Sequence, residues 1–191
     1  MYRVRNKGAR AGFTLVEIAI VLVIIGLLIG GVLKGQAMIE NAKVKRVIKD
    51  ADEIRAAVMT FYDKYGMYPG DENSASIPPG TDWEGDGDGM IENNQERYEV
   101  FQDLRLAGLI GGNYNGTSDL PRNPYGGQMS LYWVDPGPGN AKHYLVYTNL
   151  PAEVCREIDS KYDDGVYNTG SISASADYTD GTTIGNFYML F

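Results

Sequence analysis

The feature that most constrains this chain is an uninterrupted apolar run close to its amino terminus. Residues 13–33 read FTLVEIAIVLVIIGLLIGGVL and contain one charged side chain, that of Glu17. A helix of this length extends about 32 Å, which is enough to cross the hydrocarbon core of a bilayer. A cleaved signal peptide is the alternative, but its apolar region is about 7–15 residues long and a small-x-small cleavage site should follow it. The run therefore predicts a membrane-spanning helix that stays in the protein.

Basic residues flank the apolar run on both sides. Four precede it and five follow it within residues 34–49, so the charge bias that normally marks the cytoplasmic end is nearly balanced. The residues before the apolar run could stay in the cytoplasm while the residues after it are exported, but the balance of charges does not require this orientation. Inserting the charged Glu17 carboxylate near the bilayer centre would cost a free energy on the order of 3 kcal/mol. The carboxylate either reaches the interface from the start of the helix or meets a positive charge from another chain.

The hexapeptide GFTLVE at residues 12–17 heads the apolar run. It resembles the prepilin signature, in which a small residue precedes F-T-L-x-E and a long apolar helix. The resemblance covers about residues 1–40 and points to type IV pilins and the pseudopilins of type II secretion. In this family a prepilin peptidase cuts after the glycine and methylates the new amino terminus. The resemblance thus implies cleavage between Gly12 and Phe13, methylation of Phe13, and an assembly role for Glu17 as fifth residue of the mature chain.

The resemblance also gives the intramembrane carboxylate a partner. Cleavage would create an α-amine on Phe13, with an unperturbed pKa near 8. In a filament core, the Phe13 amine of one subunit can meet Glu17 of a neighbour, so that each charge lowers the desolvation cost of the other. Such a pair would set the axial register of the subunits more than it would add net stability.

The helical pattern continues after the apolar run, over residues 34–65. Apolar residues recur there at i, i+3 and i+4, and Gly66 and Pro69 follow as stop signals. One helix is therefore expected from Phe13 to Tyr65, apolar all round in its first half and amphipathic in its second. The apolar stripe of the second half should pack against the body of the protein. Its members are Val44, Val47, Ile48, Ala51, Ile54, Val58, Phe61, Tyr62 and Tyr65.

The remaining sequence predicts an α+β body in which an antiparallel sheet packs on the long helix. Four segments are therefore expected: a leader (1–12), an apolar helix (13–33), an amphipathic helix (34–65) and a globular head (66–191). Within the head, turn signals separate short periodic runs. The predicted helices are residues 97–110 and 150–162, and the predicted strands are residues 129–134, 142–148, 170–176 and 186–191.

Charge is distributed unevenly between these segments. The whole chain has 17 Lys+Arg and 25 Asp+Glu, for a net charge of −8, and the excess of acid lies in residues 66–191. This acidity argues against nucleic-acid binding. A single cysteine, Cys155, and a single histidine, His143, exclude a disulfide within the chain and Cys- or His-rich metal centres. His143 is expected to be a packed or surface residue, because no serine or cysteine partner is recognisable for it. Cys155 is expected to be a small buried apolar residue on a helix face.

An acidic loop within the head suggests a calcium site. Residues 82–96 read DWEGDGDGMIENNQE, and Glu84, Asp86 and Asp88 match positions 1, 3 and 5 of an EF-hand loop. Gln95 falls at position 12, where a bidentate Glu is usual, and Asp82 or Glu92 could complete the shell. The predicted ligands are therefore Glu84, Asp86, Asp88, Glu92 and Gln95. A solvated Asp-Gly turn is the alternative.

A second group of acids lies at the end of the predicted helix 150–162. Asp159, Asp163 and Asp164 would meet the negative end of the helix dipole, so the group should need a cation or an arginine, unless it is an exposed turn.

The sequence predicts a structural subunit of a type IV pilus or a type II secretion pseudopilus, and not an enzyme. The alternative is a low-abundance, calcium-dependent minor pilin or adhesin at a filament tip. The resemblance implies prepilin peptidase, an inner-membrane assembly platform and other pilin subunits as partners. It also implies a single-pass precursor in the bacterial inner membrane with its head in the periplasm, and later a surface pilus or periplasmic pseudopilus.

Overall fold

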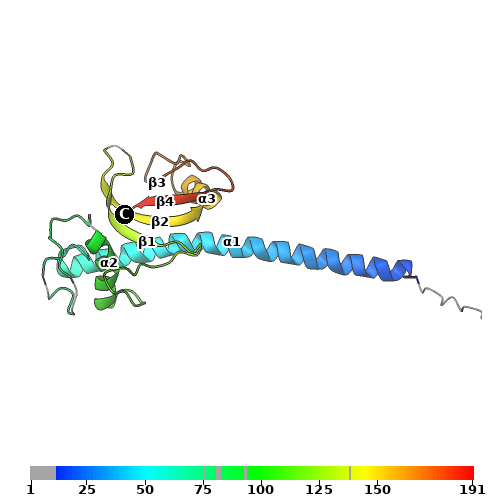
Figure 1. Ribbon diagram of the computed structural model, residues 1–191, viewed down its shortest axis with the longest axis horizontal. Coiled ribbons are helices and arrows are strands. Elements are labelled where there is room, and N and C mark those ends of the chain that lie inside the picture. The colour runs from blue at the N-terminus through cyan, green and yellow to red at the C-terminus, as the bar shows by residue number, and fades with distance from the viewer. Residues whose placement is uncertain (1–11, 75, 81–82, 93, 138) are drawn as a thin grey trace, which may run out of the picture. The chain divides into compact units, whose positions relative to one another are not determined.

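The computed structural model describes residues 12–74, 76–80, 83–92, 94–137 and 139–191. It divides into two units, Met1–Ala42 and Lys43–Phe191, and the helix α1 (Leu15–Tyr65) runs from the first into the second (Figure 1). The predicted long helix is therefore confirmed. The leader residues 1–11 and Asp82, one of the candidate calcium ligands, lie outside the described residues.

The first unit presents apolar side chains to its surroundings. The large apolar residues between Phe13 and Leu33 are all exposed, by 45% to 90%. Within the described residues, α1 is the one helix that is long and apolar enough to cross a membrane. Length, composition and exposure together agree with the predicted membrane-spanning first half.

In the second unit, α1 buries one face. The buried positions follow helical spacing, as the sequence pattern predicts, except that Tyr62 of the predicted stripe is 41% exposed and Ala57, outside that stripe, is buried. The helix ends at Tyr65, where the Gly66 amide donates to the Tyr62 carbonyl at 2.7 Å and Gly66 adopts a φ of +77°. That φ is open to glycine and strained for other residues, which explains the stop at this place. The buried residues of α1 are Val44, Val47, Ala51, Ile54, Ala57, Val58 and Phe61.

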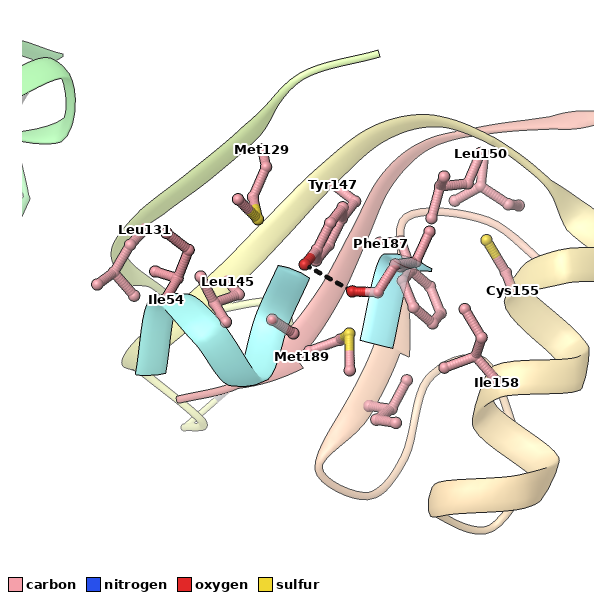
Figure 2. Close-up of a cluster of buried hydrophobic side chains, with 14 of the residues drawn as sticks. Ile54, Met129, Leu131, Leu145, Tyr147, Leu150, Cys155, Ile158, Phe187 and Met189 are labelled. Carbon is pink, nitrogen blue, oxygen red and sulfur yellow. Dashed lines mark hydrogen bonds between the residues drawn. The ribbon is translucent and has the colours of Figure 1, made fainter. Parts of the chain in front are cut away.

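A four-stranded antiparallel sheet packs on this face, in the order β1-β2-β4-β3. The Tyr147 hydroxyl on β2 donates to the Val47 carbonyl of α1 at 3.1 Å (Figure 2). Arg55 of α1 donates to the Leu190 carbonyl of β4 at 2.7 Å. The helix thus serves as the spine of an α+β head, as predicted. The strands are β1 (Met129–Val134), β2 (Lys142–Pro151), β3 (Ile172–Ala174) and β4 (Thr183–Leu190).

Two shorter helices complete the head, and their bounds differ from the predicted ones. The helix expected at 97–110 is α2 (Asn94–Leu106), and it ends early in a Schellman motif. There the Gly108 amide donates to the Arg105 carbonyl, the Leu109 amide donates to the Leu104 carbonyl, and Gly108 has a φ of +75°. The helix expected at 150–162 is α3 (Ala152–Tyr162), because β2 continues to Pro151.

The last two strands also have shifted bounds. The strand expected at 170–176 contains three residues as β3, since the ladder to β4 covers Ile172–Ala174 only. The strand expected at 186–191 begins earlier, at Thr183, because β2 extends far enough to pair with it. The core lies between the sheet, α1 and α3, where Phe187, Ile158 and Cys155 meet in Figure 2. Cys155 is fully buried, which confirms its expected packing role.

Candidate functional site

The start of α1 is closed by a reciprocal capping box. Thr14 is the N-cap, and its Oγ1 accepts a hydrogen bond from the Glu17 amide at 3.2 Å. The Glu17 carboxylate accepts from both the Thr14 amide and the Thr14 hydroxyl, each at 2.8 Å. Two donors that a helix start leaves unsatisfied are thereby satisfied. The spacing of three residues between Thr14 and Glu17 is a sequence signal for a capping box. The family resemblance assigns Glu17 to assembly only and gives Thr14 no role.

The capping box leaves the predicted cleavage bond outside the helix. Gly12 and Phe13 precede α1 and have no regular structure, and the Phe13 side chain is 84% exposed. A peptide bond in an extended segment can enter a protease site without unwinding a helix turn. The capping box also holds the Glu17 carboxylate against the amide of Thr14. Thr14 would be the second residue of a chain cleaved before Phe13. Glu17 therefore bonds to Thr14, the residue that directly follows Phe13, and the structure adds Thr14 to the predicted residues.

The acidic loop is organised around Asp71, which the sequence pattern does not indicate. The Asp71 carboxylate is 1% exposed and accepts hydrogen bonds from the Gly87 and Gly89 amides, both at 3.0 Å. Gly85 also pairs with the chain near Asp71, through a 2.6 Å bond from its amide to the Glu72 carbonyl. The loop is thus tied down at its glycines, while its own acids remain on the outside.

Three carboxylates, one of them from this loop, lie close together. Oxygen atoms of Asp71, Asp86 and Glu96 lie within 4.8 Å of one another, and Asp71 and Glu96 are buried. Burial, together with the charges of Asp88 and Glu96, raises the pKa of Asp71 to about 6. Of the five predicted calcium ligands, Asp86 alone belongs to this group. Glu96 follows the predicted Gln95 directly in sequence, whereas Asp71 comes from a distant turn.

The other predicted ligands lie outside the group. The Gln95 amide donates to Glu99 at 2.9 Å and to the Gly116 carbonyl at 2.8 Å, so it joins α2 to a neighbouring loop. Asp88 accepts from the Met90 amide at 2.8 Å and stabilises its own turn. The side chains of Glu84 and Glu92 are exposed. The calcium prediction therefore remains a prediction, with a changed set of nearest carboxylates.

The second acidic group is satisfied by the chain itself. Asp159 accepts from the Tyr178 hydroxyl at 2.6 Å, and burial raises the pKa of its carboxyl. Asp163 accepts from the Ser171 and Ile172 amides at 2.6 and 2.7 Å. Asp164 accepts from the Thr169 hydroxyl at 2.6 Å. Backbone amides and hydroxyls thus bind these carboxylates at the turn between α3 and β3. Oxygen atoms of the three residues also lie within 4.8 Å of one another, so the expected cation remains a prediction.

His143 is a packing residue, as expected. Its Nε2 accepts from the Ile91 amide at 3.1 Å, and its ring lies against Tyr68 and Trp133. Burial lowers the pKa of His143 to about 4, so the ring is neutral at physiological pH. A neutral ring can accept this bond and a protonated ring cannot. His143 therefore anchors the end of the acidic loop to β2.

Comparison with known proteins finds a family match for the amino-terminal part of the chain. Residues 7–33 match the family described as Prokaryotic N-terminal methylation motif. No curated protein and no solved structure matches the chain. The match covers the predicted cleavage dipeptide, the capping box and the apolar half of α1 together. The chain therefore carries the amino-terminal signature of type IV pilin and pseudopilin precursors.

Proposed function

We propose that this chain is a structural subunit of a type IV pilus or a type II secretion pseudopilus. The precursor is cleaved after Gly12, Phe13 becomes the methylated amino terminus, and the subunits assemble through α1. The observation that carries the proposal is the methylation motif, placed on a capped helix whose apolar side chains are exposed. The motif points to a structural protein, so the proposed role is not enzymatic.

The charge distribution supports a route for the precursor. The four leader bases would hold the amino terminus in the cytoplasm, with the apolar half of α1 in the inner membrane and the head in the periplasm. A prepilin peptidase would remove the leader and its charges. An inner-membrane assembly platform would then move α1 from the membrane into a filament of pilin subunits.

Within that filament, Glu17 would change its partner. In the single chain its carboxylate accepts from Thr14. In the assembled state it would pair with the methylated Phe13 amine of a neighbour, a charged donor that binds a carboxylate more strongly than a neutral one does. This exchange would fix the register between neighbours more than it would add net stability to the filament.

Cleavage by a prepilin peptidase tests the proposal. The precursor, co-produced with such a peptidase, should lose its first twelve residues, and Gly12→Leu should remain uncut because the bulky side chain replaces the small residue of the motif. Gly8→Leu is the matched control, since it changes a leader glycine that the motif does not require. Cutting of Gly12→Leu at the wild-type rate, or no cutting of the wild type, would contradict the proposed processing.

A second candidate role is that of a low-abundance, calcium-dependent minor pilin or adhesin at a filament tip. The convergence of Asp71, Asp86 and Glu96 favours it, since three nearby carboxylates repel one another unless a cation or a proton joins them. Counting subunits separates the two roles. A tip protein would be rare in sheared filaments, and a structural subunit would dominate them.

We also propose that calcium binds at this group. Carboxylate oxygens are the ligands that calcium prefers, and it takes six to eight of them with carbonyls and waters. Asp71, Asp86 and Glu96 would supply the first three, and the exposed acids of the same loop are close in sequence. A bound ion would stiffen a head that has no disulfide, because Cys155 is its one cysteine.

A further inference from the structure

The head contains a groove that the proposed processing and assembly do not use. It has a volume of about 610 Å³ and lies between α1 and the segment from Leu109 to Met129. Apolar side chains from both walls line it, among them Ile54, Leu109 and Ile110. A cavity of this size and lining is suited to a large apolar group.

Two arginines, Arg46 and Arg122, are among the residues that line this groove. Arg46 reaches Asp50 at 3.5 Å, and its side chain is still 71% exposed. Arg122 donates to the Gly126 carbonyl at the long distance of 3.4 Å and has no ion pair among the described residues. Asp50 and Glu53 also line the groove, and both are paired, Asp50 with Arg46 and Glu53 with Lys49 at 3.0 Å. The groove therefore has apolar and charged side chains in its walls, and Arg122 is its charged group outside any ion pair among the described residues.

The complementary feature lies elsewhere on the same head. Trp83 is 42% exposed, although its indole is among the largest apolar side chains in the protein. It is followed by the exposed acids Glu84, Asp86 and Asp88. The bonds to Asp71 and Glu72 hold this loop in place, so little conformational entropy would be lost on docking. None of these residues lines the groove.

We propose that Trp83 of one copy docks into the groove of the next copy, with Asp88 facing Arg122 and Glu84 facing Arg46. The proposal rests on the proposed function, since it describes a contact between subunits of a filament. An exposed tryptophan bordered by acids matches a groove that has apolar side chains in both walls and Arg122 outside any ion pair of the described residues, in both polarity and charge.

The positions of the two surfaces favour a second copy of this chain as the occupant. Each copy carries both the groove and the tryptophan loop, on different parts of its surface. Such a contact is heterologous, and repeating it extends a filament unless the rotation closes a ring. One tryptophan buries about 150–250 Å², far less than the roughly 1,200 Å² of a stable interface. The contact should therefore form where α1 already joins the subunits.

Cysteine cross-linking in assembled filaments tests the contact. Glu84→Cys keeps Trp83, and Gly111→Cys adds a side chain to the groove wall, where no atom lies within 4 Å of the new Cβ. With both substitutions in one chain, mild oxidation of sheared filaments should give a ladder of dimers, trimers and larger products. Lys161→Cys with Gly111→Cys is the matched control, because Lys161 lies on α3 away from the loop, and it should give no ladder.

Charge reversal provides a second test. Arg122→Glu, added to the Glu84→Cys and Gly111→Cys pair, should lower the cross-linked fraction about tenfold, because it places a carboxylate opposite Asp88 and its neighbours. Adding Asp88→Arg to that variant should restore much of the ladder. Equal ladders in all variants would contradict the charge pairing.

The outcomes separate this proposal from the proposed function. Processed filaments that form normally without a ladder from the 84–111 pair would overturn the docking proposal alone. A cross-link to a protein of another mass would show a different occupant and would also overturn it. A wild-type chain that never enters filaments would overturn the proposed function itself, and the mass of the cleaved subunit detects that separately.

Discussion

The packing of α1 as the spine of the head can be tested with one matched pair of substitutions. Phe61 is fully buried, and its ring centroid lies 4.6 Å from that of Tyr65. Replacing a buried Phe with Ala costs about 3–5 kcal/mol through lost burial and the cavity left behind. At about 2–4 °C per kcal/mol for a chain of this size, Phe61→Ala should lower the Tm by about 10 °C.

The control lies two residues away on the same helix. Met59 is 49% exposed, so Met59→Ala should change the free energy of unfolding by less than about 0.5 kcal/mol. Both variants keep strong helix formers in α1, so any difference between them reports packing against the head. Thermal unfolding of the full chain in detergent micelles, followed by near-ultraviolet circular dichroism, measures both. Equal Tm values for the two variants would refute the packing of α1 described above.

Three further predictions concern assembly, calcium and pH. Glu17→Ala should abolish filament assembly while leaving the head's Tm unchanged, and normal filaments of this variant, counted by microscopy, would contradict the register role. Millimolar calcium should raise the head's Tm, and the rise should be smaller at pH 5 than at pH 7, because the Asp71 carboxyl, with a pKa of about 6, is mostly protonated at pH 5. Asp71→Asn should remove this rise in Tm. Asp164→Asn, which changes an exposed acid outside the group, should retain it. Stability should fall as the pH drops from about 6.5 to 4, since the unfolded state takes up the His143 proton first. After allowance for partial solvent screening, this loss is about 2 kcal/mol, and the raised pKa of Asp71 opposes it. His143→Gln, which keeps an acceptor for the Ile91 amide, should show a shallower pH dependence in denaturant titrations, and an unchanged slope would exclude His143 as its source.

The long helix and the main strands could be predicted because their signals are local. The stripe from Val44 to Phe61 has the helical period, and the run at Met129–Val134 is bounded by turn residues on both sides. The bounds of α2 could not be predicted as well, because its end depends on the left-handed backbone of Gly108 and not on the apolar pattern. The extent of β4 depended on how far β2 continues, which is a non-local property.

The candidate sites divide in the same way. The cleavage dipeptide and Glu17 follow from a contiguous motif, and the spacing of Thr14 and Glu17 also contained the capping box. Asp71 comes close to Asp86 because its carboxylate accepts a hydrogen bond from the Gly87 amide of the other loop, and no periodicity in the sequence encodes that approach. The groove depends likewise on the meeting of α1 with residues more than fifty positions away.

The mass of the intact subunit in sheared filaments tests the central claim most directly. The account predicts a dominant species that begins at Phe13 and carries one additional methyl group. Recovery of that species from the filament fraction would establish both the processing site and the assembly. A chain that keeps its leader, or one that is cut after the apolar run and lacks the apolar half of α1, would contradict the account.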